Sequence, residues 1–361
     1  MAITAETLAI AERLRRQVGS IVDDVTRSLT AAWVGAWDQV VVEVIAAIGE
    51  LLQLGDGKWP TRRQIFRSAR TISALDLIGQ TLDRLATATL AQTAVAAAQA
   101  ARLGIEAQGD LVASQLPYGS TRALAAKYGV QQADTIDAIA RRTAERINAK
   151  HWPLSDEATR RMKNELVRGV VVGDNPREAA ARMVRNLEGE FNGGLGRALN
   201  LARTEILDSH RAAAEAGQEA HGDVLAGWVW HCELNSSRGR TCPACWALHG
   251  TVHPLSEPGP IDHQQGRCSR TPKTKSWADL GFDVPEPPDL IPNAREVFDL
   301  LPEDEQVAIM GRRRLDLLRS GEIEWEDLPQ LRTTPDWRDS YGVRPVKDLE
   351  RIAAERAHRA A

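Results

Sequence analysis

Residues 240–250 read RTCPACWALHG, and residues 263–268 read HQQGRC. The two stretches contain four residues that can bind a metal ion: Cys242, Cys245, His263 and Cys268. The first two thiols are two residues apart, which lets both sulfur atoms reach one ion from a tight turn. Three thiolates and one imidazole fill a tetrahedral shell and leave no open position. The spacing therefore predicts a structural zinc (Zn2+) site.

The composition around these residues favours metal over disulfides. All four cysteines of the chain lie between residues 232 and 268, whereas the disulfide-bonded cysteines of a secreted scaffold are spread along the chain. The segment is rich in Gly, Pro, Ser and Cys and poor in aliphatic residues, so it needs another source of folding free energy. Metal binding supplies about 10–16 kcal/mol in small zinc peptides. The alternative is a set of free thiols.

Three further donors lie nearby. We expect Cys232 to be a buried thiol that packs as a small hydrophobe beside Trp230. His249 and His253 flank Gly250, and we expect both on the surface.

Three classes of enzyme use similar residues. A zinc deaminase needs a His-x-Glu or Cys-x-Glu triplet before its Cys pair, and the sequence has none. An HNH-like nuclease would use Asp262 and His263, but it needs further His or Asn ligands. The alternating run Glu322, Glu324 and Glu326 is similar to that of some ADP-ribosyltransferases, but its surroundings predict helix and turn. We expect no enzyme, with the nuclease as the alternative.

The sequence before this segment predicts helices. Apolar residues recur at steps of three and four on one face: Leu14, Val18, Ile21, Val22, Val25, Leu29 and Trp33. We expect breaks at residues 55–57, 117–119 and 173–175, and another at Gly193-Gly194.

The remaining segments complete the predicted fold. Residues 228–230 alternate like a strand, residues 283–293 are a Pro-rich linker, and residues 295–301, 303–320 and 346–358 predict short helices. We predict a mainly α fold: a long N-terminal helical domain, then a small α+β zinc-stabilised lobe and a short helical C-terminal tail. The predicted segments are an N-terminal helical domain (1–150), a second helical block (151–226), the zinc-binding lobe (227–282), and the linker with an acidic tail (283–361).

The charge of the chain excludes a protein that coats nucleic acid by electrostatic excess, because the formal net charge is −4. Two apolar stretches, residues 33–52 and 85–103, predict soluble helices, so we expect no membrane partner. Around the Cys/His segment, basic residues outnumber acidic residues. Six residues form a candidate contact with DNA: Arg238, Arg240, Arg267, Arg270, Lys273 and Lys275. A solvated basic face is the alternative explanation.

Taken together, these motifs resemble the phage minor head proteins of the Mu F-like (head morphogenesis) family. The matching pieces are Ala202-Arg203-Thr204-Glu205 on a helix, the strand leading into the Cys pair, the stretch 263–268, and the tail around residues 311–323. The resemblance covers roughly residues 155–350. One departure is Gly266, which stands where many members have a cysteine.

The resemblance implies a low-copy structural protein of the phage head. It would associate with the portal protein during procapsid assembly and influence DNA packaging or ejection. Further implied partners are the major capsid or scaffolding protein and, weakly, the packaged DNA. The implied location is the virion, in the head interior or at the portal vertex, after assembly in the host cytoplasm.

Overall fold

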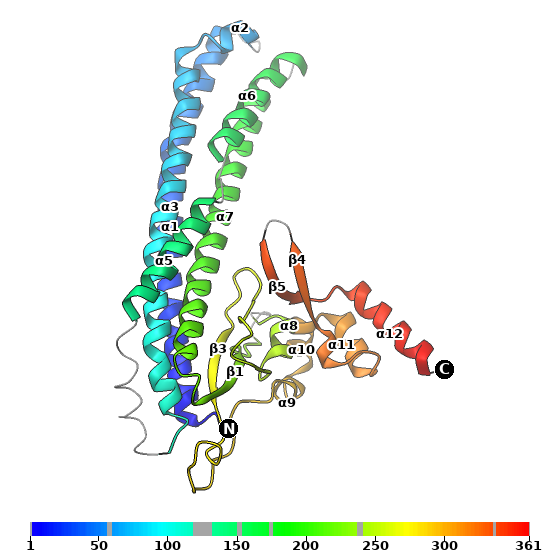
Figure 1. Ribbon diagram of the computed structural model, residues 1–361. Helices are drawn as coiled ribbons and strands as arrows, with labels where there is room; N and C mark the ends of the chain where they lie inside the picture. The colour runs from blue at the N-terminus through cyan, green and yellow to red at the C-terminus, as the bar shows by residue number, and fades with distance from the viewer. Residues whose placement is uncertain are drawn as a thin grey trace. The chain divides into compact units, whose positions relative to one another are not determined.

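The computed structural model describes residues 2–55, 60–117, 132–149, 154–172, 176–236, 241–334 and 337–360. It is mainly helical, with a long N-terminal helix and a small strand-containing region in the C-terminal half (Figure 1), which confirms the predicted fold class. The predicted breaks at 56–57, 118–119 and 173–175 lie outside the described residues.

The longer helices are α1 (Ala5–Leu54), α3 (Ala69–Ala113), α5 (Gln132–Ala149), α6 (Leu154–Val172), α7 (Pro176–Glu219) and α12 (Val346–Ala360). The short helices are α2 (Arg62–Ile65), α8 (Pro243–Leu248), α9 (Ala294–Asp299), α10 (Glu303–Met310), α11 (Arg312–Arg319) and the 3-10 turn η2 (Trp325–Asp327). The strands are β1 (Leu225–His231), β2 (Val252–His253), β3 (Ser269–Thr274), β4 (Pro329–Thr334) and β5 (Trp337–Val343).

The chain forms two compact units. Unit 1 contains residues 1–19, 98–139 and 207–361, and unit 2 contains residues 20–97 and 140–206. The division passes through α1, α3, α5 and α7, so each of these helices contributes to both units. The segment borders predicted at residues 150, 226 and 282 stay predictions.

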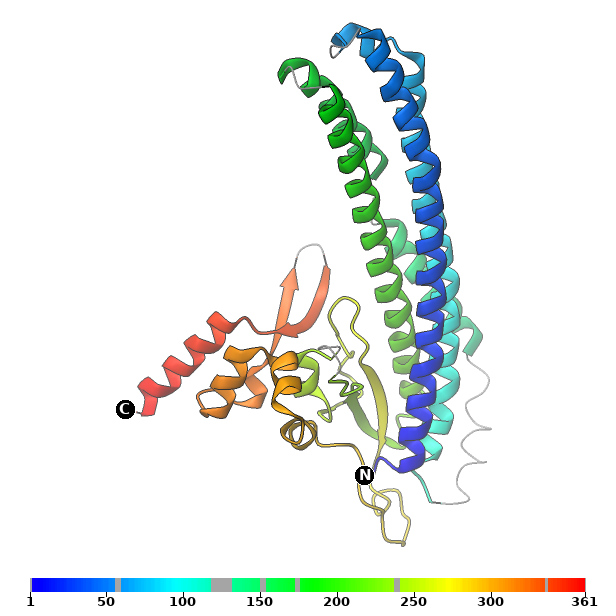
Figure 2. The ribbon, with the colours of Figure 1, turned by 180° about the vertical axis from the view of Figure 1, so that it is seen from behind.

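Unit 2 is a helical assembly in which α1 and α3 lie side by side (Figures 1 and 2). Its core joins Trp33 and Val40 of α1, Ile78 of α3 and Phe191 of α7, all nearly inaccessible to solvent. The Trp33 and Phe191 rings meet edge to face with their centroids 6.2 Å apart, an arrangement that aromatic pairs favour.

Two glycine positions differ from the sequence prediction. Helix α7 continues through Gly193 and Gly194 without a break. A glycine costs about 1 kcal/mol relative to alanine in a helix interior, and the buried Phe191 and Ala198 on either side offset that cost by packing in the core. Conversely, Gly311 has φ of 73°, a left-handed conformation that favours glycine, and it separates α10 from α11 where one helix was predicted.

Helix α1 is long and apolar enough to cross a membrane by length and composition. Helices in the cores of soluble proteins pass the same test, and one face of α1 packs Trp33, Val40 and Val44 into the core of unit 2. The expectation that α1 is a soluble helix stays a prediction.

In unit 1, three antiparallel strands form a sheet in the order β2-β1-β3. The outer backbone edge of β3 is covered by the side chain of Gln115, which lies in the turn after α3. The Gln115 amide donates to the Pro272 carbonyl (2.8 Å) and accepts from the Thr274 amide (3.1 Å). Gln115 therefore replaces a neighbouring strand at an edge that would otherwise offer unpaired hydrogen-bonding groups.

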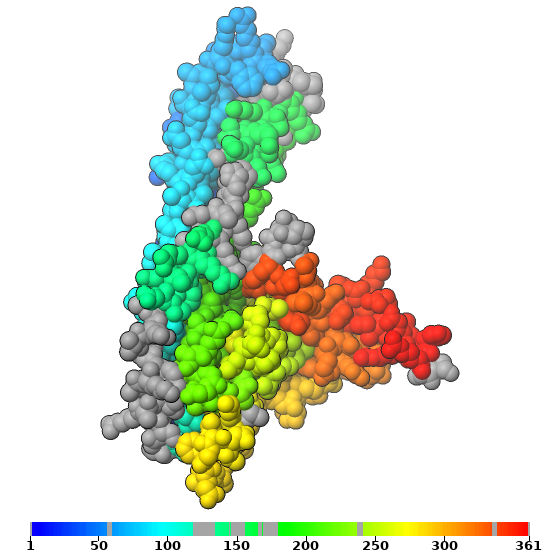
Figure 3. All heavy atoms as spheres, viewed as in Figure 1, coloured from blue at the N-terminus to red at the C-terminus, as the bar shows by residue number. Residues whose placement is uncertain are grey.

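The lobe and the tail share a core. Trp246 of α8 is fully buried and packs with Phe298 of α9, Met310 of α10, Leu317 of α11 and Leu349 of α12. These segments form one continuous mass, from yellow-green to red, in the space-filling view (Figure 3).

The tail is not purely helical. Strands β4 and β5 form an antiparallel hairpin shortly after Glu326, where the sequence predicted only helix and turn. That prediction was wrong because each strand is stabilised by pairing with the other, and the local composition does not show that pairing. The hairpin packs back on the lobe, where the Tyr341 ring meets the edge of Trp230 with centroids 5.7 Å apart.

Candidate metal centre

The first two predicted ligands lie at the start of α8. Cys242 is the N-cap residue, and its sulfur accepts a hydrogen bond from the Cys245 backbone amide (3.5 Å). Pro243 occupies the first helical turn, where its missing N–H costs nothing. The cap and the turn bring the two sulfur atoms to 3.4 Å from each other. Local sequence alone therefore builds this half of the site.

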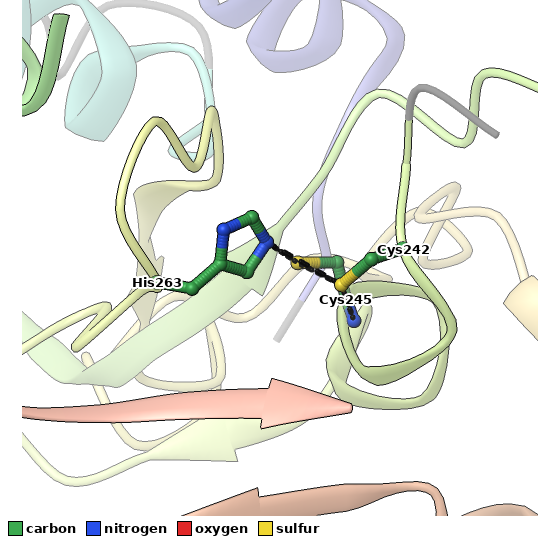
Figure 4. Close-up of side chains that lie close together, drawn as sticks. All are labelled: Cys242, Cys245 and His263. Atoms are coloured by element: carbon green, nitrogen blue, oxygen red, sulfur yellow. Dashed lines mark hydrogen bonds between the residues drawn. The ribbon is translucent and has the colours of Figure 1, made fainter. Parts of the chain in front are cut away.

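His263 approaches from the second stretch and points its Nε2 at both sulfurs (Figure 4). The distances are 3.4 Å to Cys242 Sγ and 3.6 Å to Cys245 Sγ. With Zn–S bonds of about 2.3 Å and Zn–N bonds of about 2.0 Å, a tetrahedral ion separates sulfur and nitrogen by about 3.5 Å and two sulfurs by about 3.8 Å. The three donor atoms are therefore spaced almost as a zinc ion requires.

Cys268, the fourth predicted ligand, lies deeper. It belongs to a second, fully buried group with Cys245 and Asp262, whose donor atoms lie within 4.8 Å of one another. Cys245 is the member that the two groups share. An ion at this centre would be bound by Cys242, Cys245 and His263. The sulfur of Cys268, which is more deeply buried than Cys242 and His263, would have to move toward the ion to become the fourth ligand.

The protonation of the donors suits metal binding in part. The hydrogen bond from Cys245 lowers the pKa of Cys242 to about 5. Burial alone would raise the pKa of Cys268, but hydrogen bonds from Cys232 and Cys245 lower it to about 6. Burial would lower the pKa of His263, but its hydrogen bond to Cys242 and the charge of Asp262 raise it to about 10. Metal binding would replace the imidazole proton, as ligation requires neutral histidine.

The second stretch is anchored by a residue that the sequence did not single out. Arg211, buried on α7, donates to Asp262 Oδ2 (3.1 Å), to the Gly266 carbonyl (2.5 Å) and to the Cys268 carbonyl (2.8 Å). It also pairs with Asp208 one turn earlier, at 2.8 Å. A single guanidinium therefore holds the Asp262 side chain and the backbone at Gly266 and Cys268. An arginine inside a helical pattern carries no sequence signal for this role.

Asp262 has its carboxylate fully occupied. Besides Arg211, it accepts from the backbone amides of His263 (2.9 Å) and Cys268 (3.0 Å), and it is completely buried. A carboxylate held in this way orients its neighbours and is poorly placed to collect a proton from a substrate.

Gly266 belongs to the same arrangement. A Cβ atom at this position would lie 2.1 Å from the Asp262 carboxyl carbon, so the carboxylate occupies the space that a side chain would need. A cysteine in this position, as in the family that the sequence resembles, would require Asp262 to move.

The three spare donors have different environments. Cys232 is buried among Trp228, Trp230 and Cys268, as expected. His249, expected on the surface, is instead buried, and its Nδ1 accepts from the Cys232 backbone amide (3.0 Å). That prediction was wrong because the turn at Gly250 folds inward, where it hydrogen-bonds to Trp230 of β1.

His253 is half-buried. Its ring stacks on the Trp228 indole with centroids 4.3 Å apart, and its Nδ1 lies 3.0 Å from Glu257.

The candidate DNA contacts are reduced by burial. Arg270 is buried, lies over the Trp228 ring at 4.7 Å and binds Gln218 (2.7 Å), so it is unavailable on the surface. Lys273 is also buried and pairs with Asp289 at 2.7 Å. The prediction that Arg270 and Lys273 contact DNA at the surface was therefore wrong, because both are buried and have structural partners.

The other four candidate DNA contacts differ in exposure or lie outside the described residues. Arg267 is exposed, and Lys275 is half-buried and donates to the Asp223 carbonyl. Arg238 and Arg240 lie outside the described residues. The surface that could meet DNA is therefore smaller than the composition suggested.

No protein-family model matches the chain, and no curated protein or solved structure matches it.

The ligand set predicts about one zinc ion per chain. Cys242→Ser should lose the metal and loosen residues 227–282, while unit 2, which has its own core, stays protected. Cys232→Ala, a buried thiol outside the set, is the matched control and should keep the metal. Elemental analysis of protein purified without added metal, with limited proteolysis, tests this. A metal-free protein whose lobe resists proteolysis would contradict the zinc site.

The position of Asp262 yields a second prediction. Gly266→Ala should lower the free energy of unfolding by about 1–3 kcal/mol, the usual cost of overpacking, and should weaken metal retention. The control is Gly109→Ala on α3, where an added Cβ meets nothing within 4 Å; it should be neutral or stabilising by up to about 1 kcal/mol. Urea unfolding measures both variants, and equal stabilities would show that Asp262 is not fixed against Gly266.

Proposed function

We propose that this chain is a structural minor head protein of a bacteriophage. It associates with the portal during procapsid assembly and influences DNA packaging or ejection. The proposal rests on the sequence resemblance to the Mu F-like family and on one observation about the site, namely that two thiols and an imidazole converge, with a further buried thiol, Cys268, grouped with Cys245. With Cys268 as the fourth ligand, three thiols and an imidazole would leave no position for a substrate, and an ion there would hold the lobe together.

The surroundings of the donor set also favour a structural role. Asp262, the nearest carboxylate, is held by Arg211 and two backbone amides. Catalytic zinc sites keep an open coordination position and a mobile acid or base beside it. Asp262 is not a mobile acid or base of this kind, so we propose that the protein is not an enzyme. We also propose that it resides in the virion.

We place the portal contact in the helical part of the chain. Unit 2 exposes three large apolar side chains around the connection from α1 through α2 to α3: Leu54, Phe66 and Ile72. We name these three residues the apolar tip. Exposed apolar residues on one connection favour contact with a partner protein, and none of the three belongs to the core cluster of unit 2.

Full-length protein should co-sediment with portal rings expressed from the same phage genome. Phe66→Glu should weaken this association about tenfold, because a charge would enter the apolar contact at a cost of about 1.4 kcal/mol. Leu300→Glu, at a side chain 86% exposed in the tail, is the matched control. Absence of co-sedimentation by the wild type would contradict the proposed function. Equal binding by the two variants would move the contact away from the apolar tip.

A second candidate is a zinc-containing DNA-binding protein or an HNH-like nuclease that uses Asp262 and His263. The observation in its favour is that the His263 side chain is 35% exposed while its Nε2 lies 3.6 Å from Asp262 Oδ1. As a catalytic base, His263 would contact the substrate directly. As a structural ligand, it would stabilise the lobe and nothing more.

Purified protein should therefore leave plasmid DNA intact with Mg2+, Mn2+ or Zn2+ present. His263→Ala should lose metal and local stability and have no cleavage to lose. Metal-dependent nicking by the wild type that is absent from a well-folded His263→Ala protein would favour the nuclease over the structural role.

A further inference from the structure

One face of α1 carries a strip of exposed residues that the rest of unit 2 leaves open. The strip consists of Arg27, Ala31, Val34 and Asp38, which recur at steps of four, three and four residues and so share a helix face. Val34 is 51% exposed, although it is large and apolar. The strip lies along an open groove of about 840 Å³, whose far side is formed by Leu199 and Arg203 of α7.

Two of the four charged residues that line this groove, Arg27 and Asp38, are arranged symmetrically, and the other two, Asp23 and Arg203, lie outside the strip. Arg27 and Asp38 lie at equal distances along the helix from a point midway between Ala31 and Val34. If a second copy of the helix packs antiparallel about that point, each Arg27 meets the other copy's Asp38. In the same register, each Ala31 meets the other copy's Val34. A parallel pair would instead bring like charges together.

We propose that the α1 strip is a self-association surface through which two copies of this chain pack antiparallel about a two-fold axis. Such a contact uses the same patch on both copies, so a strip that complements itself is what the symmetry demands. Two Arg–Asp pairs then flank a small apolar centre. This inference does not depend on the proposed head function.

The backbone at the centre of the strip is open to close approach. Gly35 lies beside Val34, and a Cβ atom added there would meet nothing within 4 Å. Ala31 and Gly35 are small, and small residues let two helices come near each other.

The ion pair that Arg27 makes within the chain competes only weakly with the proposed pair to Asp38 of a second copy. Arg27 contacts Asp24 one turn earlier at 3.1 Å, with both side chains more than 60% exposed. Exposed pairs of this kind contribute little to stability, so exchanging Asp24 for the Asp38 of a second copy costs little.

A lipid surface is the rival occupant, because α1 has the length and composition of a membrane span. The strip itself argues against lipid. Arg27 and Asp38 would enter the hydrocarbon, where charged side chains are costly, whereas a second copy offers each of them an opposite charge.

Sedimentation of the full-length protein over a range of concentrations tests the proposal. The wild type should self-associate. Arg27→Asp and Asp38→Arg should each weaken association about tenfold, about 1.4 kcal/mol, because each makes both contacts of the pair repulsive. An equimolar mixture of the two variants should associate as well as the wild type, since every contact then joins opposite charges again.

Two further variants separate this contact from general effects. Arg84→Asp reverses an exposed charge on α3 and should leave association unchanged. Gly35→Leu should keep the helix content but block close approach and weaken association.

Three results would overturn the proposal. The first is a wild type that stays monomeric throughout. The second is a mixture of the two charge variants that associates no better than either variant alone. The third is a monomer that binds neutral phospholipid vesicles through this strip, which would assign the surface to lipid.

Discussion

The buried contact between Arg211 and the stretch from Asp262 to Cys268 is the interaction on which the candidate metal centre depends. One guanidinium satisfies the Asp262 carboxylate and two backbone carbonyls at once. Removing one partner of a buried ion pair leaves an uncompensated charge, which costs about 3–5 kcal/mol. The position of two of the four predicted ligands therefore depends on a helix that lies some fifty residues earlier in the chain.

The two halves of the centre are consequently built by different means. Cys242 and Cys245 are positioned by the cap and first turn of α8, a local arrangement that needs no distant partner. His263 and Cys268 are positioned by Asp262 and by Arg211, through burial and hydrogen bonding over a long sequence separation. A metal ion joining the halves would link a locally formed turn to a loop that the tertiary structure holds, which is how a structural zinc contributes to folding.

Buried tryptophans supply the core that the aliphatic residues could not. Trp228, Trp230 and Trp246 are all essentially inaccessible to solvent. Arg270 covers the face of Trp228 and binds Gln218, whose amide in turn donates to Gln108 of α3 (2.9 Å). Basic residues that the composition assigned to the surface are thus used inside the molecule, so the segment offers less positive charge to a polyanion than its sequence suggests.

The sequence by itself determined the helical class, the strand at residues 228–230 and the identity of the candidate ligands, because periodicity and Cys/His spacing are local properties. It did not determine the role of Arg211, the burial of His249 or the reason for Gly266. The role of Arg211 and the reason for Gly266 depend on the space beside Asp262, and the burial of His249 depends on the inward turn at Gly250. A helix pattern does not encode such contacts between distant segments. The continuity of α7 through Gly193 and Gly194 was likewise decided by packing, since the buried residues around them outweigh the helix propensity of glycine.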